Sequence, residues 1–200
     1  MKGISIAIFF LLGLSLHSCD QAGSEGEGNS ANEDAIERVG EGNAAQEEHP
    51  ELTCYFFFIS DCPACRNNLP KVVDLAQRYA DQGLEVIGVV SDPELDEDLL
   101  QETLETFGVK FEIQRDEDLQ IARQHGATVT PQVFLYDASE TLLYSGQFDN
   151  YYFELGRHRK NITETWLEDA IQAAQGNNLP KVSRTEPIGC VINFDYFSEG

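Results

Sequence analysis

The chain has 200 residues, of which 35 are acidic and 13 are basic, so its formal net charge is −22. Such a charge repels nucleic-acid phosphates and anionic lipid surfaces, which excludes nucleic acid as a partner and membrane binding through the protein surface. Hydrophobic residues make up 42% of the chain, enough to bury the core of one domain of ordinary size.

Residues 1–18 have the pattern of an export signal. Lys2 precedes an apolar run from Ile4 to Leu16, which has the length of a signal-peptide core and is too short for a stable membrane anchor. The run ends in Leu-His-Ser-Cys, which resembles the lipobox of bacterial lipoproteins, whose cysteine is lipidated. An ordinary secretory signal with a chance cysteine is the alternative. We expect a protein of the bacterial cell envelope, lipid-anchored to a membrane at Cys19 and facing the periplasm or the cell exterior.

Residues 19–51 are expected to form a disordered acidic tether. Positions 20–51 contain ten acidic residues, one basic residue, five glycines and no aromatic residue. Such a segment buries too little apolar surface to offset its ordering entropy, and its self-repulsion keeps it extended. The folded domain is therefore expected over 52–200, with a C-terminal extension over 176–200.

The start of this domain combines a strand, a cysteine pair and a helix. Residues 53–60 are a short apolar, largely aromatic run, which predicts a buried strand. From Leu69 to Tyr79 the apolar residues recur at helical spacing. Cys62 and Cys65 lie between these elements, with Pro63 in the first helical turn, where a missing N–H has no cost. The sequence therefore places a C-x-x-C motif at a strand-to-helix turn.

This position favours thiol–disulfide chemistry. The thiolate is the nucleophile in disulfide exchange, and the N-terminus of a helix stabilises it through unpaired N–H groups and partial positive charge. Cys62 is then the attacking sulfur, and Cys65, one turn further on, the resolving one. Half of a zinc site and an inert structural disulfide are the alternatives. The chain has no second C-x-x-C and no H-x-x-x-H pair to complete a zinc site.

The remaining pattern alternates between apolar strands and amphipathic helices and then ends in a hairpin and a helix. This order predicts an α/β fold with a central mixed β-sheet flanked by helices. The expected elements are a strand at 84–90, a helix from 91 to about 107, a strand at 109–113, a helix at 116–125, a strand at 133–136, its hairpin partner at 141–145 and a helix at 161–175.

With Cys62-Pro63-Ala64-Cys65 and the later Thr130-Pro131, the region 53–175 resembles the thioredoxin superfamily. The long segment before Pro131 is similar to the insertion of the TlpA, ResA and AhpC/TSA-related redoxin branch. The resemblance implies a thioredoxin-like fold with a redoxin-type insertion and a cis bond before Pro131, beside the cysteine pair. It also implies that Thr130 and Pro131 bind an incoming extended chain, next to Pro63 and Ala64 of the motif.

Three positions depart from related patterns. Phe56 stands where thioredoxin has a buried acidic residue, and Asp61 stands in place of its tryptophan. A carboxylate beside Cys62 should oppose thiolate formation and keep the pKa of Cys62 from falling very low. Ile59 stands where peroxiredoxins have a threonine, which disfavours peroxidase activity.

Two further cysteines have no assigned role in the motif. The tail over 179–192 looks like the C-terminal extension of some bacterial redoxin-domain proteins, which share its late Gly-Cys-x-Ile. Cys190 in that tail is interpreted as a third redox thiol, a disulfide partner of Cys54, or a buried apolar residue. Pairing cannot be read from sequence.

The leading hypothesis is a membrane-anchored thiol–disulfide oxidoreductase that reduces disulfides in exported proteins. Its redox-active disulfide needs no other cofactor, and a membrane protein such as a thiol–disulfide transporter would supply electrons. A copper-binding protein like the SCO family, using His125 or His158, is an alternative, as is a peroxiredoxin-like peroxidase. SCO motifs have three residues between the cysteines, whereas this chain has two. A partner-binding module stapled by an inert disulfide is the non-catalytic alternative.

Overall fold

The structure, a computed structural model, describes residues 51–196. The expected signal segment, Cys19 and nearly all of the expected tether lie outside the described residues. Within 51–196, no helix is both long enough and apolar enough to cross a membrane.

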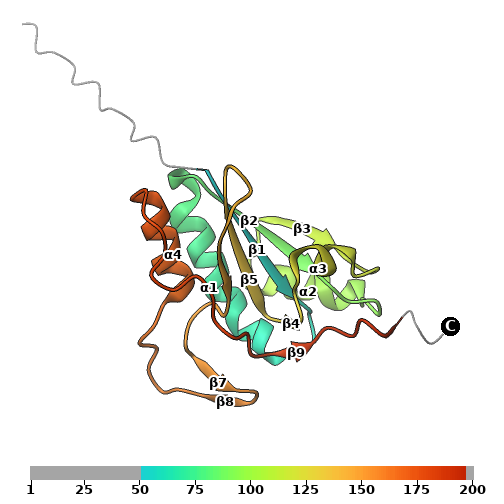
Figure 1. The fold of residues 1–200 in the computed structure, drawn as a ribbon. Helices are drawn as coiled ribbons and strands as arrows, with labels where there is room; N and C mark the ends of the chain where they lie inside the picture. Colours follow the sequence, from blue (N-terminus) through green and yellow to red (C-terminus); the bar gives the residue numbers. More distant parts are fainter. Residues whose placement is uncertain (1–50, 197–200) are drawn as a thin grey trace, which may run out of the picture. The chain divides into compact units, whose positions relative to one another are not determined.

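A five-stranded mixed sheet forms the centre of the domain (Figure 1). Its order is β3-β2-β1-β5-β6. Strands β1, β2 and β3 are mutually parallel, β5 runs antiparallel to β1, and β6 pairs antiparallel with β5. The strand bounds are Leu52–Phe58 for β1, Leu84–Val90 for β2, Glu112–Arg115 for β3, Gln132–Asp137 for β5 and Leu142–Gly146 for β6. This mixed sheet flanked by helices confirms the predicted thioredoxin-like fold class.

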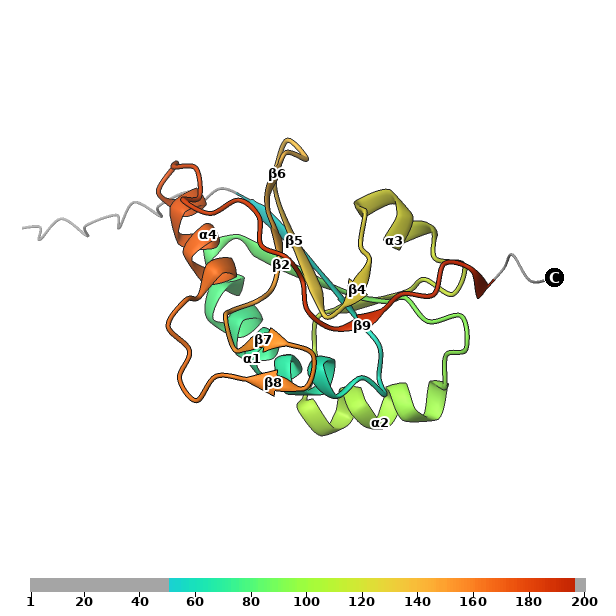
Figure 2. The same cartoon turned by 60° about the horizontal axis from the view of Figure 1, so that its bottom comes forward.

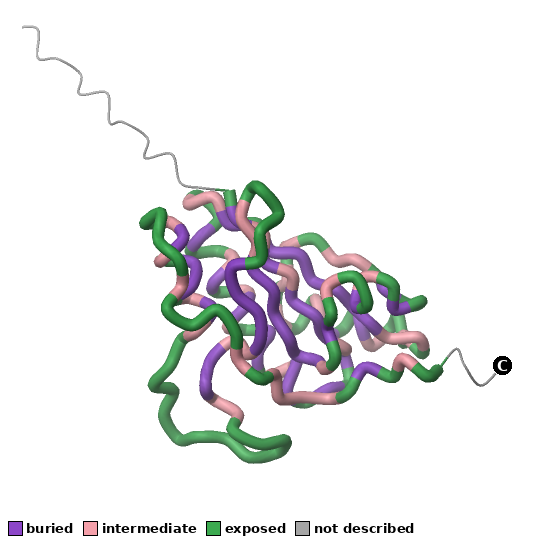
Figure 3. The backbone as a smooth tube through the Cα atoms, viewed as in Figure 1, coloured by how far each residue is buried: buried purple, intermediate pink, exposed green. Residues whose placement is uncertain are grey.

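Successive side chains of β1 point alternately into two hydrophobic cores. Phe56 and Phe58 face a core that contains residues of α1, α2 and α4, whereas Phe57 faces a smaller core with α3. The helix bounds are Pro63–Tyr79 for α1, Glu97–Phe107 for α2, Gln120–His125 for α3 and Trp166–Gln175 for α4, and a 3-10 turn, η1, spans Ala80–Gln82. Burial is greatest along the central strands (Figure 3). Because both faces of β1 are buried, its sequence is a continuous apolar run.

Helices α2 and α3 begin later than predicted, and hydrogen bonds that side-chain carboxylates accept from their first turns explain both shifts. Helix α2 begins at Glu97 because Asp96 caps it, its carboxylate accepting from the Leu99 N–H at 2.9 Å. Asp92 instead forms a local turn, accepting from the Glu94 N–H. Helix α3 begins at Gln120, and the side chain of buried Asp116 accepts hydrogen bonds from backbone N–H groups in its first turn. The Asp116 carboxylate accepts from Ile121 N, Ala122 N and Ser91 Oγ, each at 2.8 Å.

The other boundary errors have long-range causes. The strand expected at 109–113 is β3 at 112–115, in the register that pairs Glu112 with Ile87 of β2. The helix expected from 161 begins at Trp166, because Thr163 is bound to Asn150 through its backbone and its hydroxyl.

Four short strands were not predicted. They form two separate pairs (Figure 2), namely β4 (Val129–Thr130) with β9 (Cys190–Val191) and β7 (Tyr152–Glu154) with β8 (Arg157–His158). Each strand is too short to produce a recognisable alternation of apolar and polar residues in the sequence. The β4–β9 pair joins the C-terminal extension to the loop that precedes β5.

The extension is also bound to the edge strand β6. Ser145 donates its N–H to the carbonyl of Ser183 at 3.0 Å, and Thr185 donates its N–H to the carbonyl of Ser145 at 2.9 Å. Gly146 allows this approach, because a Cβ there would lie 2.2 Å from Thr185 Oγ1 and its φ of +139° is unfavourable for other residues. The tail therefore follows a defined path across the domain.

Candidate active site

Cys62 lies at the junction of β1 and α1, as the sequence predicts. It is the N-cap residue of α1, and Pro63 occupies the first helical position. Both Cys62 and Cys65 are almost fully buried, with 1% and 0% of their surface exposed. The strand therefore delivers the first cysteine to the helix N-terminus, and the helix places the second beside it.

Hydrogen bonding lowers the pKa of Cys62 from an ordinary value of 9.0 to about 5. The largest contribution is a hydrogen bond from the Cys65 thiol, which outweighs the opposing effect of burial. The Cys190 thiol and the backbone N–H groups of Cys65 and Ala64 lower the pKa further, although none of these N–H groups makes a capping bond of regular geometry. Cys62 is therefore a thiolate at neutral pH, the form required of a nucleophile.

Cys65 has the opposite character. Burial raises the pKa of Cys65 well above its ordinary value, and the hydrogen bond it donates to Cys62 and the negative charge of Cys62 raise it further. A thiol that stays protonated beside a thiolate matches the division into attacking and resolving sulfurs. The roles of Cys62 as attacking sulfur and Cys65 as resolving sulfur remain predictions. Those roles require a low pKa for Cys62 and a high pKa for Cys65, as found here.

The Thr130–Pro131 bond is cis, as the resemblance implied. It brings the carbonyl oxygen of Thr130 within 3.6 Å of Cys62 Sγ. Thr130 is buried, and its side chain also acts on the pKa of Cys65. The structure thus brings Thr130 and Pro131 beside the pair Cys62 and Cys65, which lies more than sixty residues earlier in the sequence.

The suggested pairing of Cys54 with Cys190 is wrong. Cys54 is buried within β1, between Val86 and Leu135 of the neighbouring strands, and burial raises its pKa to about 12. Cys190 lies in β9, where its sulfur is 2.6 Å from Cys62 Sγ. All four described cysteines are free thiols. Sequence reasoning kept a third redox thiol as one option for Cys190, but no local signal could place it beside Cys62.

The expected effect of Asp61 is also wrong. The pKa of Cys62 falls to about 5 despite the neighbouring carboxylate, because the hydrogen bonds donated to the sulfur outweigh the effects that oppose its ionisation. The pKa of Cys190 is raised to about 12, mainly by burial and by the hydrogen bond and negative charge of Cys62. The charge of Asp61 adds a smaller contribution in the same direction. Both neighbours of the Cys62 thiolate are therefore protonated hydrogen-bond donors.

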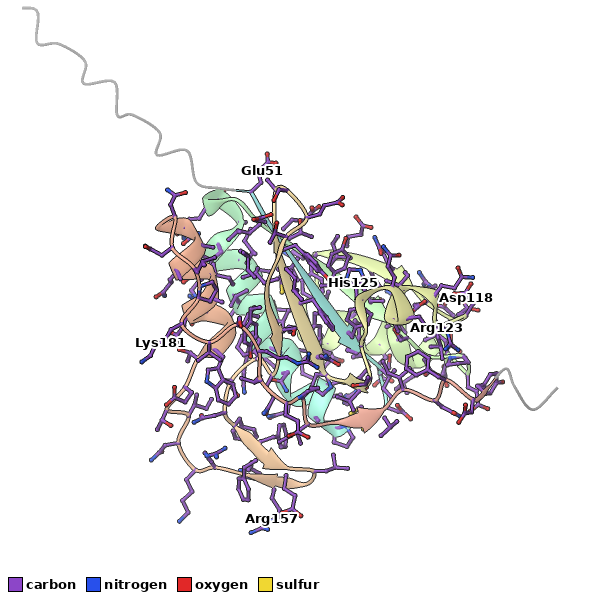
Figure 4. The ribbon with its side chains drawn as sticks, viewed as in Figure 1. Glu51, Asp118, Arg123, His125, Arg157 and Lys181 are labelled. Carbon is purple, nitrogen blue, oxygen red and sulfur yellow. The ribbon has the colours of Figure 1, made fainter. Side chains whose placement is uncertain are left out.

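Both histidines among residues 51–196 lie outside this site. His125, labelled in Figure 4, has its Nδ1 2.9 Å from the Tyr136 hydroxyl, and its ring packs on Tyr55. Burial lowers the pKa of His125, which favours its neutral form. His158 is exposed on β8, where its ring stacks on Tyr151 with centroids 4.7 Å apart. Within residues 51–196, no three His, Cys, Asp or Glu side chains are grouped so as to hold a metal ion.

Comparisons with known proteins bear on the family and the fold. Residues 48–145 match the model of the AhpC/TSA family. A hypothetical protein from Sinorhizobium meliloti is 27% identical, over 74% of this chain and 82% of that one, with a TM-score of 0.65. An uncharacterised protein from Geobacillus kaustophilus is 22% identical, over 72% and 78% of the two chains, with a TM-score of 0.63. No curated protein matches the chain. The family match supports an oxidoreductase activity.

Proposed function

Since residues 48–145 belong to the AhpC/TSA family of redoxins, within the thioredoxin superfamily, we propose that this protein is a thiol–disulfide oxidoreductase working through Cys62 and Cys65. The observation that carries the proposal is the low pKa of Cys62, about 5, next to a Cys65 thiol whose pKa is raised. Two equivalent, inert structural cysteines would not be expected to titrate so far apart.

The exchange proceeds in two substitutions at sulfur. The Cys62 thiolate attacks one sulfur of a substrate disulfide, that S–S bond breaks, and the second substrate sulfur leaves as a thiolate. Cys65 then loses its proton and attacks Cys62 Sγ, which releases the first substrate sulfur as a thiolate. The substrate has gained two electrons, and Cys62 and Cys65 are joined in a disulfide. A dithiol donor must reduce that disulfide before the next cycle.

The substrates we propose are disulfide-containing exported proteins, and the proposed donor is a thiol–disulfide transporter in the membrane. Lipid anchoring at Cys19 in the bacterial envelope would hold the domain near that donor. The redox group we propose for this exchange is the Cys62–Cys65 disulfide. The export pattern of residues 1–18 and the acidic composition of 19–51 support this location.

The proposal is tested with the full chain by reduction of insulin disulfides, with dithiothreitol as the donor. Cys62→Ser should lower the catalysed rate at least about a hundredfold, because an alcohol cannot replace the thiolate nucleophile. Cys54→Ala is the matched control, since Cys54 is a buried thiol outside the motif, and it should keep most of the activity. Equal activity of Cys62→Ser and the unmodified chain would refute the proposal.

A further inference from the structure

The C-terminal segment 187–194 occupies the edge beside the cis proline. Strand β9 pairs antiparallel with β4, so that Cys190 lies opposite Thr130 and Val191 opposite Val129. The Ile192 N–H extends this pairing by donating to the carbonyl of Thr128 at 3.0 Å. This is the edge at which the thioredoxin resemblance implies that an incoming extended chain binds. The protein's own tail therefore lies where a substrate chain would lie.

The position of Cys190 strengthens the likeness to a bound substrate. Its sulfur is 2.6 Å from Cys62 Sγ, so the two sulfurs are in direct contact. The preceding Gly189 makes this approach possible, because a Cβ at that position would lie 2.0 Å from the carbonyl oxygen of Thr130. A glycine immediately before the cysteine lets the two backbones come close enough for the sulfurs to meet.

Contacts after Cys190 hold the segment in place. Ile192 is buried in the core that contains α3. Arg123, labelled in Figure 4, donates to the carbonyl of Phe194 at 3.2 Å and stacks on the Phe194 ring. Together with the bonds between Thr185 and Ser145, these contacts fix the chain on both sides of Cys190. The proximity of the two sulfurs is therefore built into the fold of the tail.

We propose that Cys190 is a third redox-active thiol, and that it forms a disulfide with Cys62 in which the tail acts as an intramolecular substrate. This inference rests on the proposed function, because it requires Cys62 to be the nucleophile.

The step needs no additional oxidant. In the Cys62–Cys65 disulfide, the Cys190 thiolate attacks Cys62 Sγ, the bond to Cys65 breaks, and Cys65 leaves as a thiolate that takes up the proton. Starting from a mixed disulfide of Cys62 with a substrate, the same attack releases the substrate sulfur as a thiolate.

Formation of a Cys62 disulfide also activates Cys190. In the reduced protein, the pKa of Cys190 is raised by burial, by its hydrogen bond to Cys62 and by the negative charges of Cys62 and Asp61. Once Cys62 is in a disulfide, its thiolate charge is gone, and two of these four effects disappear. Cys190 is also only partly buried, whereas Cys65 is fully buried. Cys190 therefore competes with Cys65 as the resolving thiol.

The test uses oxidised glutathione and the full chain carrying Cys19→Ser, so that the four described cysteines are the only thiols. In Cys65→Ser, glutathione should first join Cys62, and Cys190 should then displace it, leaving a protein that has lost two hydrogens. In the double variant Cys65→Ser, Cys190→Ser, the glutathione adduct should persist on Cys62, because neither resolving thiol is present. Cys65→Ser with Cys54→Ala is the matched control and should behave like Cys65→Ser.

Intact mass and chymotryptic peptide mapping read the outcome, because cleavage at the aromatic residues 55–58 separates Cys54 from Cys62. A peptide of Cys62 linked to Cys190 in Cys65→Ser supports the inference. A stable glutathione adduct in Cys65→Ser, equal to that of the double variant, overturns it. If no adduct forms on Cys62 even in the double variant, the proposed function fails as well, which distinguishes the two failures.

Discussion

Hydrogen-bond donors surround the Cys62 sulfur: the thiols of Cys65 and Cys190 and two N–H groups at the start of α1. An anion that accepts several hydrogen bonds is favoured over its protonated form. The low pKa of Cys62 is therefore a property of its neighbours, and changing those neighbours should move it in a known direction.

Alkylation by iodoacetamide measures this pKa, because only the thiolate reacts. In the reduced chain we expect the rate at Cys62 to reach half its maximum near the pKa of about 5. Below that pH the rate should fall about tenfold per pH unit. A half-maximal rate near pH 9 would contradict the proposed environment of this sulfur.

Removing either thiol donor should raise the pKa of Cys62. Cys65→Ala should raise it most, because the Cys65 hydrogen bond is the largest cause of the shift, and Cys190→Ala should raise it by a smaller amount. The same alkylation profile, with reacted sites identified by mass spectrometry, gives both values. Cys54→Ala serves as the control and should leave the profile unchanged, and an equally unchanged profile for Cys190→Ala would argue against its hydrogen bond.

Among the elements, the β4–β9 pair depends on a single glycine. Gly189→Ala places a Cβ against the carbonyl oxygen of Thr130, so β9 must move away from β4. We expect hydrogen exchange of the Ile192 amide to become at least about tenfold faster, since it loses its bond to Thr128. Gly176→Ala, at the end of α4 and outside the tail contacts, is the matched control. Unchanged exchange in Gly189→Ala would show that the tail does not depend on this close approach.

Helix α3 depends on the buried carboxylate of Asp116. Asp116→Ala removes the acceptor of two backbone N–H groups and of the Ser91 hydroxyl. Buried donors left without partners should destabilise the fold by about 3 kcal/mol. Urea unfolding measures this difference. Asp118→Ala, in the exposed turn just before α3, should cost much less, and equal losses for the two variants would contradict the capping role of Asp116.

The sequence was sufficient for elements with a strong local pattern. The expected helix after the cysteine pair and the strand at 84–90 match α1 and β2, because helical spacing and a buried apolar run are local signals. The start of α2 was placed too early, because Asp92 and Asp96 are both acceptable caps and only the folded chain selects between them.

The same distinction holds for the site. Cys62, Cys65 and Pro131 were predicted together because a short motif and a recognisable Thr-Pro mark them. The position of Cys190 depends on a two-residue strand pairing with a segment sixty residues earlier, and no periodicity records such a contact. The shift in the pKa of Cys62 was misjudged because it depends on hydrogen bonds that form only in the folded site. The largest comes from Cys65, and another comes from Cys190 in the tail.

At the scale of the whole molecule, the Cys62 thiolate makes the free energy of unfolding depend on whether the protein is reduced or oxidised. The pKa of Cys62 falls from 9.0 to about 5 on folding, so its contribution to stability is complete above pH 9 and is lost as the pH falls through 5. The oxidised protein has no such thiolate. Between pH 5 and pH 8, urea unfolding of the reduced chain should therefore show a gain on the order of a few kcal/mol, absent in Cys62→Ser. A gain of the same size in Cys62→Ser would assign it to other groups.

Stabilisation of the reduced form also sets the expected redox behaviour, because it makes the disulfide a stronger oxidant. The pKa of Cys62, about 5, lies between those of the thioredoxin and DsbA cysteines, which are about 7 and about 3.5. The reduction potential of the Cys62–Cys65 pair should accordingly lie between their potentials, roughly −270 mV and −120 mV.

That potential is the most direct test of the central claim. The full chain is equilibrated with glutathione or dithiothreitol buffers, and its free thiols are counted by mass spectrometry. The account predicts a reversible two-electron couple in this range that disappears in Cys62→Ser. A pair that stays oxidised below about −300 mV would instead be a structural disulfide, and would contradict the assignment of an oxidoreductase.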